Sequence, residues 1–243
     1  MLKTLDFKGS YETIADAFSS RKEDISKQVN DAVNDIINDV KLNGDKALMK
    51  YCAQFDGFEI EDPRDFIVSK QEILDGVSIV GKDFIRIIER TKEQLIAFHQ
   101  NQVEKSWSLY KDNGVLMGQI VRPIEKLALY VPGGTATYPS TVMMNAIPAI
   151  LAGVKDISII TPVKSDGKVN PTILAAAYVC GIDKIYKVGG AQGVAAVALG
   201  TKTIQKVDKI VGPGNIYVAT AKKCCYGMVD IDMVAGPSEI LIV

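Results

Sequence analysis

Leu127-Ala128-Leu129-Tyr130-Val131-Pro132-Gly133-Gly134 joins an apolar run to a glycine-rich turn. The same pairing recurs three more times before residue 243, and a helical pattern follows at least three of the four turns. The four turns are Pro132-Gly133-Gly134, Gly189-Gly190-Ala191-Gln192-Gly193, Gly212-Pro213-Gly214-Asn215 and Gly236-Pro237-Ser238-Glu239. At the carboxyl ends of parallel strands, such turns place backbone N–H groups and helix N-termini along one sheet edge, where anionic ligands bind. The pattern therefore predicts an α/β protein that handles a nucleotide.

Strand and helix patterns alternate around these turns. We expect strands over 127–131, 157–161, 184–188 and 209–211, and helices over 140–152, 171–180, 192–199 and 215–226. This order implies right-handed βαβ units and a twisted, mainly parallel sheet. A fifth strand pattern, Glu239–Val243, stops with the sequence itself. Because a domain seldom ends inside a buried strand, we expect the chain to be cut short.

The first hundred residues carry a helical periodicity. Apolar residues recur every three or four positions from 25 to 40, and Asn43-Gly44 supplies a helix stop. Two further helices are expected over 45–55 and 82–102. Between 106 and 121 the period changes to two, and Asn113-Gly114 favours a tight hairpin. The sequence thus predicts a helical region, then a β-hairpin with a domain boundary nearby, then the sheet.

The composition is that of a folded protein without a strong net charge. Of the 243 residues, 47% are hydrophobic, which is enough for a substantial core. Lys and Arg number 28 against 29 Asp and Glu, and this balance argues against a nucleic-acid partner. The N-terminus lacks the apolar core of a signal peptide, and no stretch approaches the roughly 20 apolar residues of a membrane span. We expect a cytoplasmic protein with no membrane partner.

The cysteines and the histidine predict no metal centre. Cys52, Cys180, Cys224 and Cys225 show no C-x-x-C spacing and fall in helical patterns, so reduced, inert thiols are expected. His99 is the one histidine of the sequence and lies late in a helical run, where a cation suits the helix terminus, so a structural role is favoured. One histidine without paired cysteines makes no strong metal cluster.

The glycine turns differ from the common nucleotide-binding motifs. The sequence contains neither G-x-G-x-x-G nor the Walker pattern G-x-x-x-x-G-K-[ST], so a nucleotide would be held in another way. Tyr130, at a strand end, could place its ring against an adenine, ribose or nicotinamide face. A plain tight turn beside a core tyrosine is the alternative.

The other turns offer polar side chains. Gln192 falls in the first turn of a helix, where its amide suits a ribose or a carboxamide. Asn215 is a preferred N-cap residue, and the glycines before it leave the helix N-terminus open to a ligand. Ser238 and Glu239 could bond a polar substrate, although Glu239 suits an exposed turn equally well.

Four motifs, taken together and in order, resemble histidinol dehydrogenases. They are Leu129-Tyr130-Val131-Pro132-Gly133-Gly134, Gly189-Gly190-Ala191-Gln192, Val211-Gly212-Pro213-Gly214-Asn215-Ile216-Tyr217-Val218 and Asp232-Met233-Val234-Ala235-Gly236-Pro237-Ser238-Glu239. The resemblance covers essentially the whole chain. It implies a cytoplasmic, zinc-dependent, homodimeric enzyme of histidine biosynthesis that oxidises L-histidinol to L-histidine through L-histidinaldehyde, with NAD as hydride acceptor in both steps. It also implies an NAD domain of incomplete Rossmann type and an aldehyde-dehydrogenase-like architecture.

The resemblance assigns roles to single residues. It implies that Tyr130, Gln192 and Asn215 contact NAD and that Ser238 contacts the substrate. The zinc ligands and the Glu-His acid/base pair of such enzymes would follow the Ala-Gly-Pro-Ser-Glu segment, and they are absent from this sequence, which stops at Val243. We therefore expect no catalytic residue and no metal ligand in this chain, and no activity from it alone.

The expected organisation has four parts, and two other functions stay open. The parts are an N-terminal arm over 1–20, the mainly helical part of a discontinuous domain over 21–112, an α/β NAD-binding domain over 113–236, and the start of a second half over 237–243. An aldehyde-dehydrogenase-like enzyme would need a nucleophilic cysteine on a loop, whereas Cys224 and Cys225 lie in a helical pattern. A non-catalytic nucleotide-binding or dimerisation module would keep the turns without the chemistry.

Overall fold

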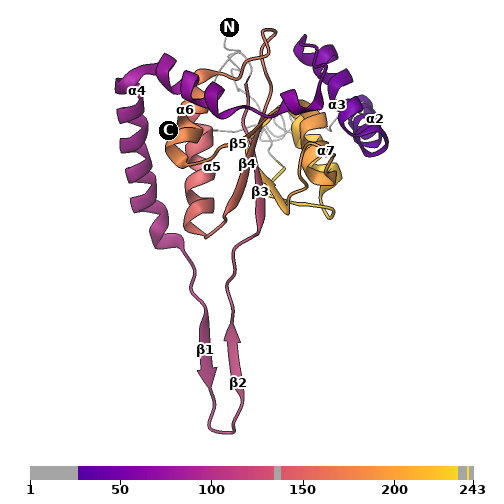
Figure 1. Ribbon diagram of the computed structural model, residues 1–243. Coiled ribbons are helices and arrows are strands. Elements are labelled where there is room, and N and C mark those ends of the chain that lie inside the picture. Colours follow the sequence, from indigo (N-terminus) through magenta and orange to yellow (C-terminus); the bar gives the residue numbers. More distant parts are fainter. Residues whose placement is uncertain (1–26, 134–137, 235–239, 241–243) are drawn as a thin grey trace, which may run out of the picture.

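The fold is built around a five-stranded parallel sheet with helices on both faces (Figure 1). The computed structural model describes residues 27–133, 138–234 and 240. The strands are β3 (Lys126–Tyr130), β4 (Asp156–Thr161), β5 (Lys184–Lys187), β6 (Lys209–Val211) and β7 (Asp230–Ile231). They lie in the order β5-β4-β3-β6-β7, with every neighbouring pair parallel. Counted from β3, these described strands follow the Rossmann order 3-2-1-4-5, which confirms the expected incomplete Rossmann sheet.

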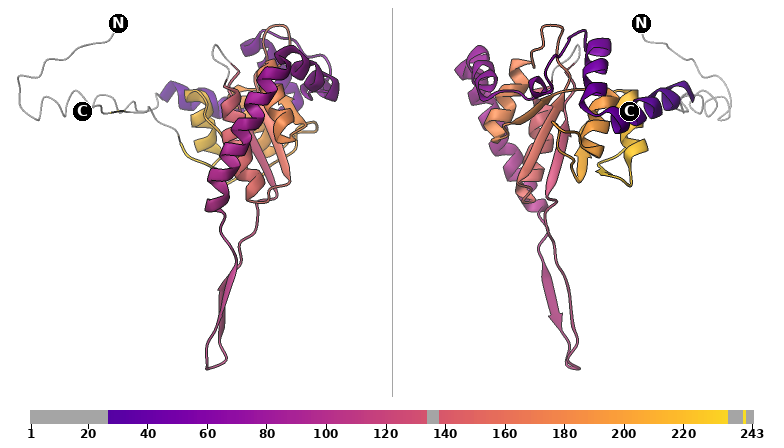
Figure 2. Two further views of the ribbon diagram at one scale, coloured as in Figure 1. Left: turned by 90° about the vertical axis from the view of Figure 1, so that its left-hand side faces the viewer. Right: turned by 45° about the vertical axis from the view of Figure 1, so that its right-hand side comes forward.

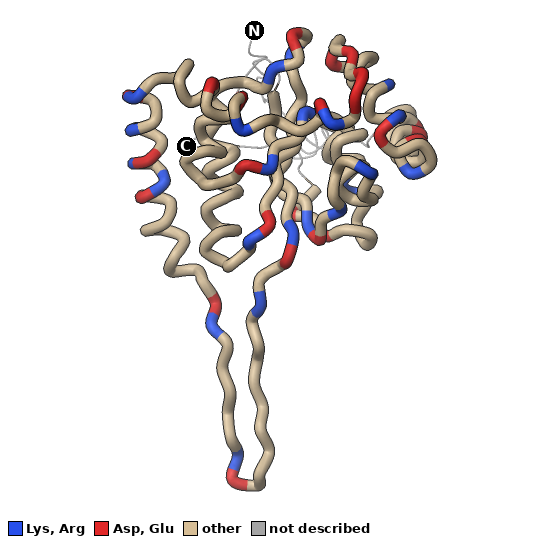
Figure 3. The backbone as a smooth tube through the Cα atoms, viewed as in Figure 1, with Lys and Arg blue, Asp and Glu red and all other residues tan. Residues whose placement is uncertain are grey.

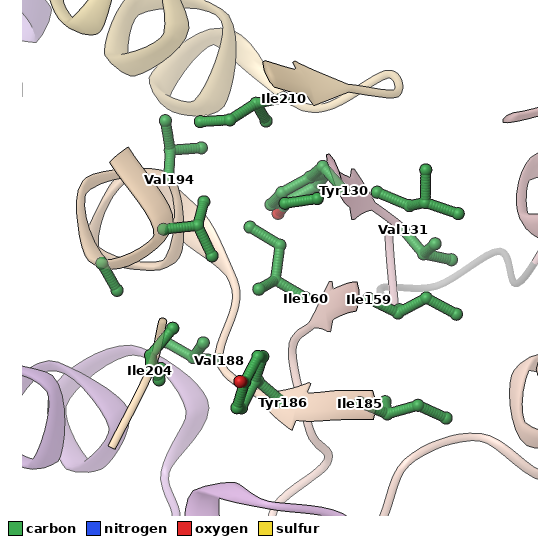
Figure 4. Close-up of a cluster of buried hydrophobic side chains, with 14 of the residues drawn as sticks. Tyr130, Val131, Ile159, Ile160, Ile185, Tyr186, Val188, Val194, Ile204 and Ile210 are labelled. Atoms are coloured by element: carbon green, nitrogen blue, oxygen red, sulfur yellow. The ribbon is translucent and has the colours of Figure 1, made fainter. Parts of the chain in front are cut away.

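Both faces of the sheet are covered. In β4 every residue from 157 to 161 is buried, as expected for a continuous apolar strand inside a parallel sheet. Successive side chains along a strand point to opposite faces. Figure 4 shows Tyr130 and Ile160 on the side of Val194, and Ile159 on the other side. The hydrophobic core therefore extends from the sheet into both helical layers.

Helices from both parts of the sequence cover the sheet. One face carries α4 (Lys70–His99), α5 (Pro139–Leu151) and α6 (Pro171–Cys180), and the other carries α2 (Lys27–Asn43), α3 (Asp45–Tyr51), α7 (Gly190–Leu199) and α8 (Ile216–Cys225). Helix α4 packs on α5 and α6, and α2 packs on α7 and α8 (Figures 1 and 2). The helical region and the sheet thus share one hydrophobic core. The expected division into domains stays a prediction.

Local sequence signals set the helix ends. Helix α2 ends at Asn43, and Gly44 follows with φ 54°, as the sequence predicts. Helix α4 begins with a capping box in which Ser69 and Glu72 bond each other's backbone N–H groups. The sequence predicts this helix only from residue 82, whereas in the structure it begins at Lys70 and is interrupted at Gly81, where φ is 78°. The described residues also contain three short helical turns, a π-helix at Cys52–Asp56 and 3₁₀ helices at Pro63–Phe66 and Gln100–Gln102.

The expected β-hairpin is present and extends away from the body of the fold (Figures 1 and 2). Strands β1 (Trp107–Tyr110) and β2 (Leu116–Gln119) pair antiparallel, and every residue of both is exposed. In the turn, Gly114 has φ 83° and donates its N–H to the carbonyl of Lys111. Figure 3 shows charged residues at the tip and the base of the hairpin and few along its strands.

The described sheet contains a fifth strand that the sequence does not predict. It is β7, whose two residues are too few to give a periodic pattern. The strand expected over 239–243 lies outside the described residues, apart from Ile240, which is exposed. Within the described ranges, no helix has the length and apolar character needed to cross a membrane.

Candidate functional site

The order of the strands reverses between β3 and β6, and such a switch point is where open α/β sheets bind ligands. The end of β3 carries Tyr130, and the end of β6 leads into the turn 212–215. The two strand ends are very close, because a Cβ on Gly212 would lie 2.3 Å from the carbonyl oxygen of Tyr130. Gly212 also has φ 114°, a conformation that side chains disfavour.

The turns after β3 and β5 meet around Pro162, at the end of β4. A Cβ on Gly133 would lie 2.7 Å from the carbonyl oxygen of Pro162, and a Cβ on Gly189 would lie 2.6 Å from its Cβ. The glycines are therefore needed where neighbouring turns pack together. The described parts of three of the four glycine turns do form one continuous edge at the carboxyl ends of the strands, as expected.

Tyr130 links two of these turns. Its hydroxyl oxygen accepts a hydrogen bond of 3.1 Å from the backbone N–H of Gly190, at the start of α7. The side chain is buried, and burial raises the pKa of Tyr130 to about 12, with a smaller contribution from the charge of Asp56. The hydroxyl therefore stays protonated near neutral pH and satisfies an N–H group that the helix leaves without an internal partner.

Gln192 lies beside the same N-terminus, in the first turn of α7 as expected. It is 2% exposed. Its Oε1 lies so near Gly190 that a Cβ there would be 2.4 Å away. The amide therefore folds back toward the turn. Tyr130, Gly190 and Gln192 thus form one buried polar cluster. The NAD contacts expected of Tyr130 and Gln192 stay predictions.

Among the expected site residues that the structure describes, Asn215 is the exposed one. Its Oδ1 accepts the backbone N–H of Val218 at 3.1 Å, so the expected N-cap of α8 is confirmed. Ile216 and Tyr217, in the first turn of α8, are also exposed. The α8 N-terminus therefore faces solvent beside the switch point, with the amide of Asn215 at its tip. Whether Asn215 contacts NAD stays a prediction.

Two charged residues near the switch point are not evident from the sequence. Lys222 is 2% exposed and pairs with Asp232, and both bond the backbone of Gly212. The sequence feature that could have indicated this pair is the position of Lys222, four residues after Val218 and three before Cys225, both of which are buried in α8. A lysine in an apolar helical stripe needs a buried partner.

A third such residue is Asp56, at the end of the π-helix. Its Oδ2 is buried and has no hydrogen-bond partner in the described structure. Burial raises the pKa of Asp56 to about 6, against a smaller opposing effect of a hydrogen bond with Cys52.

Burial also raises the pKa of the Cys52 thiol to about 12, and those of Cys180 and Cys225 to about 11 and about 12. All four cysteines are free, and the three buried thiols are too weakly acidic to be nucleophiles near neutral pH.

Some of the expected chemistry lies outside the described residues or is not found within them. Ser238 and Glu239, in the fourth turn, fall outside the described ranges. Within those ranges, no group of three or more His, Cys, Asp or Glu side chains could hold a metal ion. The ring of His99 is held by Gln102, whose Oε1 lies 2.6 Å from its Nδ1.

Comparison with known proteins identifies relatives along the whole chain. Residues 19–243 match the family model for histidinol dehydrogenase. The histidinol dehydrogenase of Lactococcus lactis subsp. lactis is 60% identical over 243 residues, which make up 100% of this chain and 56% of the relative. That of Clostridium acetobutylicum is 56% identical over 204 residues, 84% of this chain and 47% of the relative. The chain spans about half the length of these curated relatives.

A solved structure shows the same fold. The crystal structure of histidinol dehydrogenase from Elizabethkingia anophelis matches with a TM-score of 0.83 at 40% identity. The match covers 88% of this chain and 49% of that chain.

Proposed function

The chain belongs to the histidinol dehydrogenase family, and from that premise we propose that it carries the NAD-binding part of an enzyme that oxidises L-histidinol to L-histidine. The observation that supports this proposal is the switch point between β3 and β6. It brings Tyr130 and the exposed N-terminus of α8 to one sheet edge. Two molecules of NAD, bound in turn, would each accept one hydride, the first from the alcohol and the second from the aldehyde after addition of water.

The residues present at the switch point suit a dinucleotide. The α8 N-terminus, where the peptide dipoles are positive, favours the pyrophosphate. The amide of Asn215 has donors for phosphate or ribose oxygens, while its Oδ1 caps the helix. Tyr130 and Gln192 are buried, so they would shape the floor of the site and fix the start of α7.

Zinc does not fit the described residues, because they contain no cluster of ligands. In our proposal the whole enzyme takes its zinc, its acid/base residues and a dimer partner from other segments and acts in the cytoplasm. Ser238 would contact the substrate. The 243 residues alone, with one histidine held at a helix end, would then bind NAD without oxidising histidinol.

The NAD proposal is tested by calorimetric titration of the chain with NAD. The informative variant is Asn215→Ser, because a serine keeps the helix cap and removes the amide donors. We expect this variant to melt at the same temperature as the original chain and to bind NAD about tenfold more weakly, the equivalent of one lost charge-assisted hydrogen bond. Asn113→Ser, at the hairpin tip, is the matched control and should bind NAD unchanged. Equal affinity of the Asn215→Ser variant would contradict the assignment of Asn215.

The activity proposal is tested by incubating the chain with histidinol, NAD and zinc and following NADH absorbance. We expect no turnover, because a general base alone typically contributes a factor of about 10² to 10⁴ in rate and the metal ligands position the substrate as well. Turnover at an ordinary enzymatic rate would show that the chain contains a complete site.

A further inference from the structure

An ion pair between a buried lysine and a more exposed aspartate holds the turn that follows β6. Lys222 Nζ donates a hydrogen bond of 2.9 Å to the carbonyl oxygen of Gly212 and forms an ion pair with Oδ1 of Asp232. Asp232 Oδ2 accepts the N–H of Gly212 at 2.8 Å. Its Oδ1 also accepts the N–H of Met233 at 2.6 Å. Both backbone polar groups of Gly212 are therefore held by the two members of one ion pair.

The pair connects three consecutive segments of the chain. Lys222 lies in α8, Gly212 follows β6, and Asp232 follows β7. The side chain of Lys222 is 3% exposed and that of Asp232 is 27% exposed. Such a partly buried pair contributes little net stability, because desolvation of the lysine charge offsets the attraction between the two groups. Its clearest effect is geometric, because it fixes the position of one peptide group.

The residue that is fixed has a special place in the site. Gly212 lies against the carbonyl of Tyr130, at a positive φ, and starts the turn that ends in Asn215. Lys222 is seven residues beyond Asn215, two turns along the same helix. The pair thus holds the turn at its first residue, while α8 holds it at its last.

We propose that Lys222 and Asp232 are positioning residues that fix the turn 212–215 against the end of β3 and thereby place Asn215 for the ligand. The identity of the ligand as NAD rests on the proposed function, whereas the fixing of the turn does not. Without the pair, the N–H and C=O of Gly212 lose their protein partners and the turn is released toward solvent. The sheet, whose strands pair independently of Lys222, keeps its structure.

The fixing of the turn is tested without any ligand, by amide hydrogen exchange of the whole chain. Lys222→Met keeps the length of the side chain and removes the charge. We expect exchange at Gly212 and Val218, whose N–H groups are hydrogen-bonded to Asp232 and Asn215, to become about tenfold faster or more, while exchange in β4 is unchanged. Lys209→Met is the matched control, since Lys209 of β6 pairs with Asp230 of β7 at 2.7 Å without touching the turn. Unchanged exchange at Gly212 and Val218, or an equal rise throughout the sheet, would overturn the proposal.

The effect on the ligand is tested by titration of NAD into a double variant. Lys222→Met with Asp232→Asn removes the unpaired carboxylate that the single variant leaves, so its melting temperature should return toward that of the original chain. The carbonyl of Gly212 still lacks its partner, and we expect NAD to bind about tenfold more weakly. NAD binding as tight as in the original chain would show that the pair is only structural. If the original chain does not bind NAD, the proposed function fails, and hydrogen exchange alone decides the positioning role.

Discussion

Gly212 carries two constraints that only glycine meets together. Its φ is 114°, and a Cβ would lie 2.3 Å from the carbonyl oxygen of Tyr130. We expect Gly212→Ala to lower the free energy of unfolding by roughly 2–4 kcal/mol, the sum of an unfavourable backbone conformation and an overpacked contact. Urea unfolding measures this difference.

The variant Gly227→Ala distinguishes the cost of the backbone conformation from the cost of the overpacked contact. Gly227 lies in the turn after α8 at φ 95°, and a Cβ there would have no heavy atom within 4 Å. Gly227→Ala should therefore lower the free energy of unfolding by only about 1–2 kcal/mol, from the backbone conformation alone. Equal losses in the two variants would mean that the close approach of β3 and β6 is relieved without cost.

The raised pKa of Asp56 predicts that the stability of the folded chain depends on pH. Its pKa is about 6 in the folded chain, above the ordinary value of 3.8, so between these values the folded state binds more protons than the unfolded state. Its contribution to stability is present below about pH 4 and is lost as the pH rises through about 6. Asp56→Asn should therefore be more stable than the original chain by about 1 kcal/mol at about pH 8, a value reduced for partial exposure.

The same comparison at about pH 2.5, below both pKa values, provides the control for Asp56→Asn. There the carboxyl is protonated in both folded and unfolded chains, and the two proteins should have equal free energies of unfolding. A stabilisation of the same size at both pH values would show that the effect is unrelated to ionisation.

The ends of the helices and the turn of the hairpin show which local features can be predicted from the sequence. The helix stop at Asn43-Gly44, the hairpin turn at Asn113-Gly114 and the N-cap at Asn215 are local, because each depends on neighbouring residues only. The bond between Tyr130 and Gly190 joins residues 60 positions apart, and the contact of Gly133 with Pro162 depends on two adjacent strands. No local sequence pattern predicts either of these two contacts.

The hairpin is the element whose contribution to stability is most clearly limited. All residues of β1 and β2 are exposed, and the hairpin extends away from the sheet (Figure 1). Replacing 106–121 by a short Gly/Ser linker should change the free energy of unfolding by less than about 0.5 kcal/mol, as for surface substitutions generally.

A matched pair of leucines sharpens this test. Leu109, in β1, is 49% exposed, and Leu129, in β3, is fully buried. Leu129→Ala should cost roughly 2–5 kcal/mol, whereas Leu109→Ala should cost less than about 0.5 kcal/mol. A large loss for Leu109→Ala would indicate that the hairpin packs against another surface in solution.

At the scale of the molecule, the alternation of strands and helices from residue 127 predicts the class of the sheet. Periodic sequence patterns do not predict the two-residue strand β7 or the ion pair of Lys222 and Asp232, because both depend on tertiary packing. The same holds for the shared core, in which α2 and α4 cover opposite faces of one sheet. Sequence motifs thus indicate the ligand-facing turns, and the folded chain shows what holds those turns together.

The most direct test of the NAD site is a map of backbone amide shifts by NMR as NAD is titrated into the isotope-labelled chain. We expect the largest shifts at the carboxyl ends of β3 and β6, above all at Gly212 and Asn215 and in the first turn of α8. The hairpin amides of 107–119 should not move. Shifts confined to another surface, or none in the low millimolar range of NAD, would contradict the placement of the cofactor at the switch point.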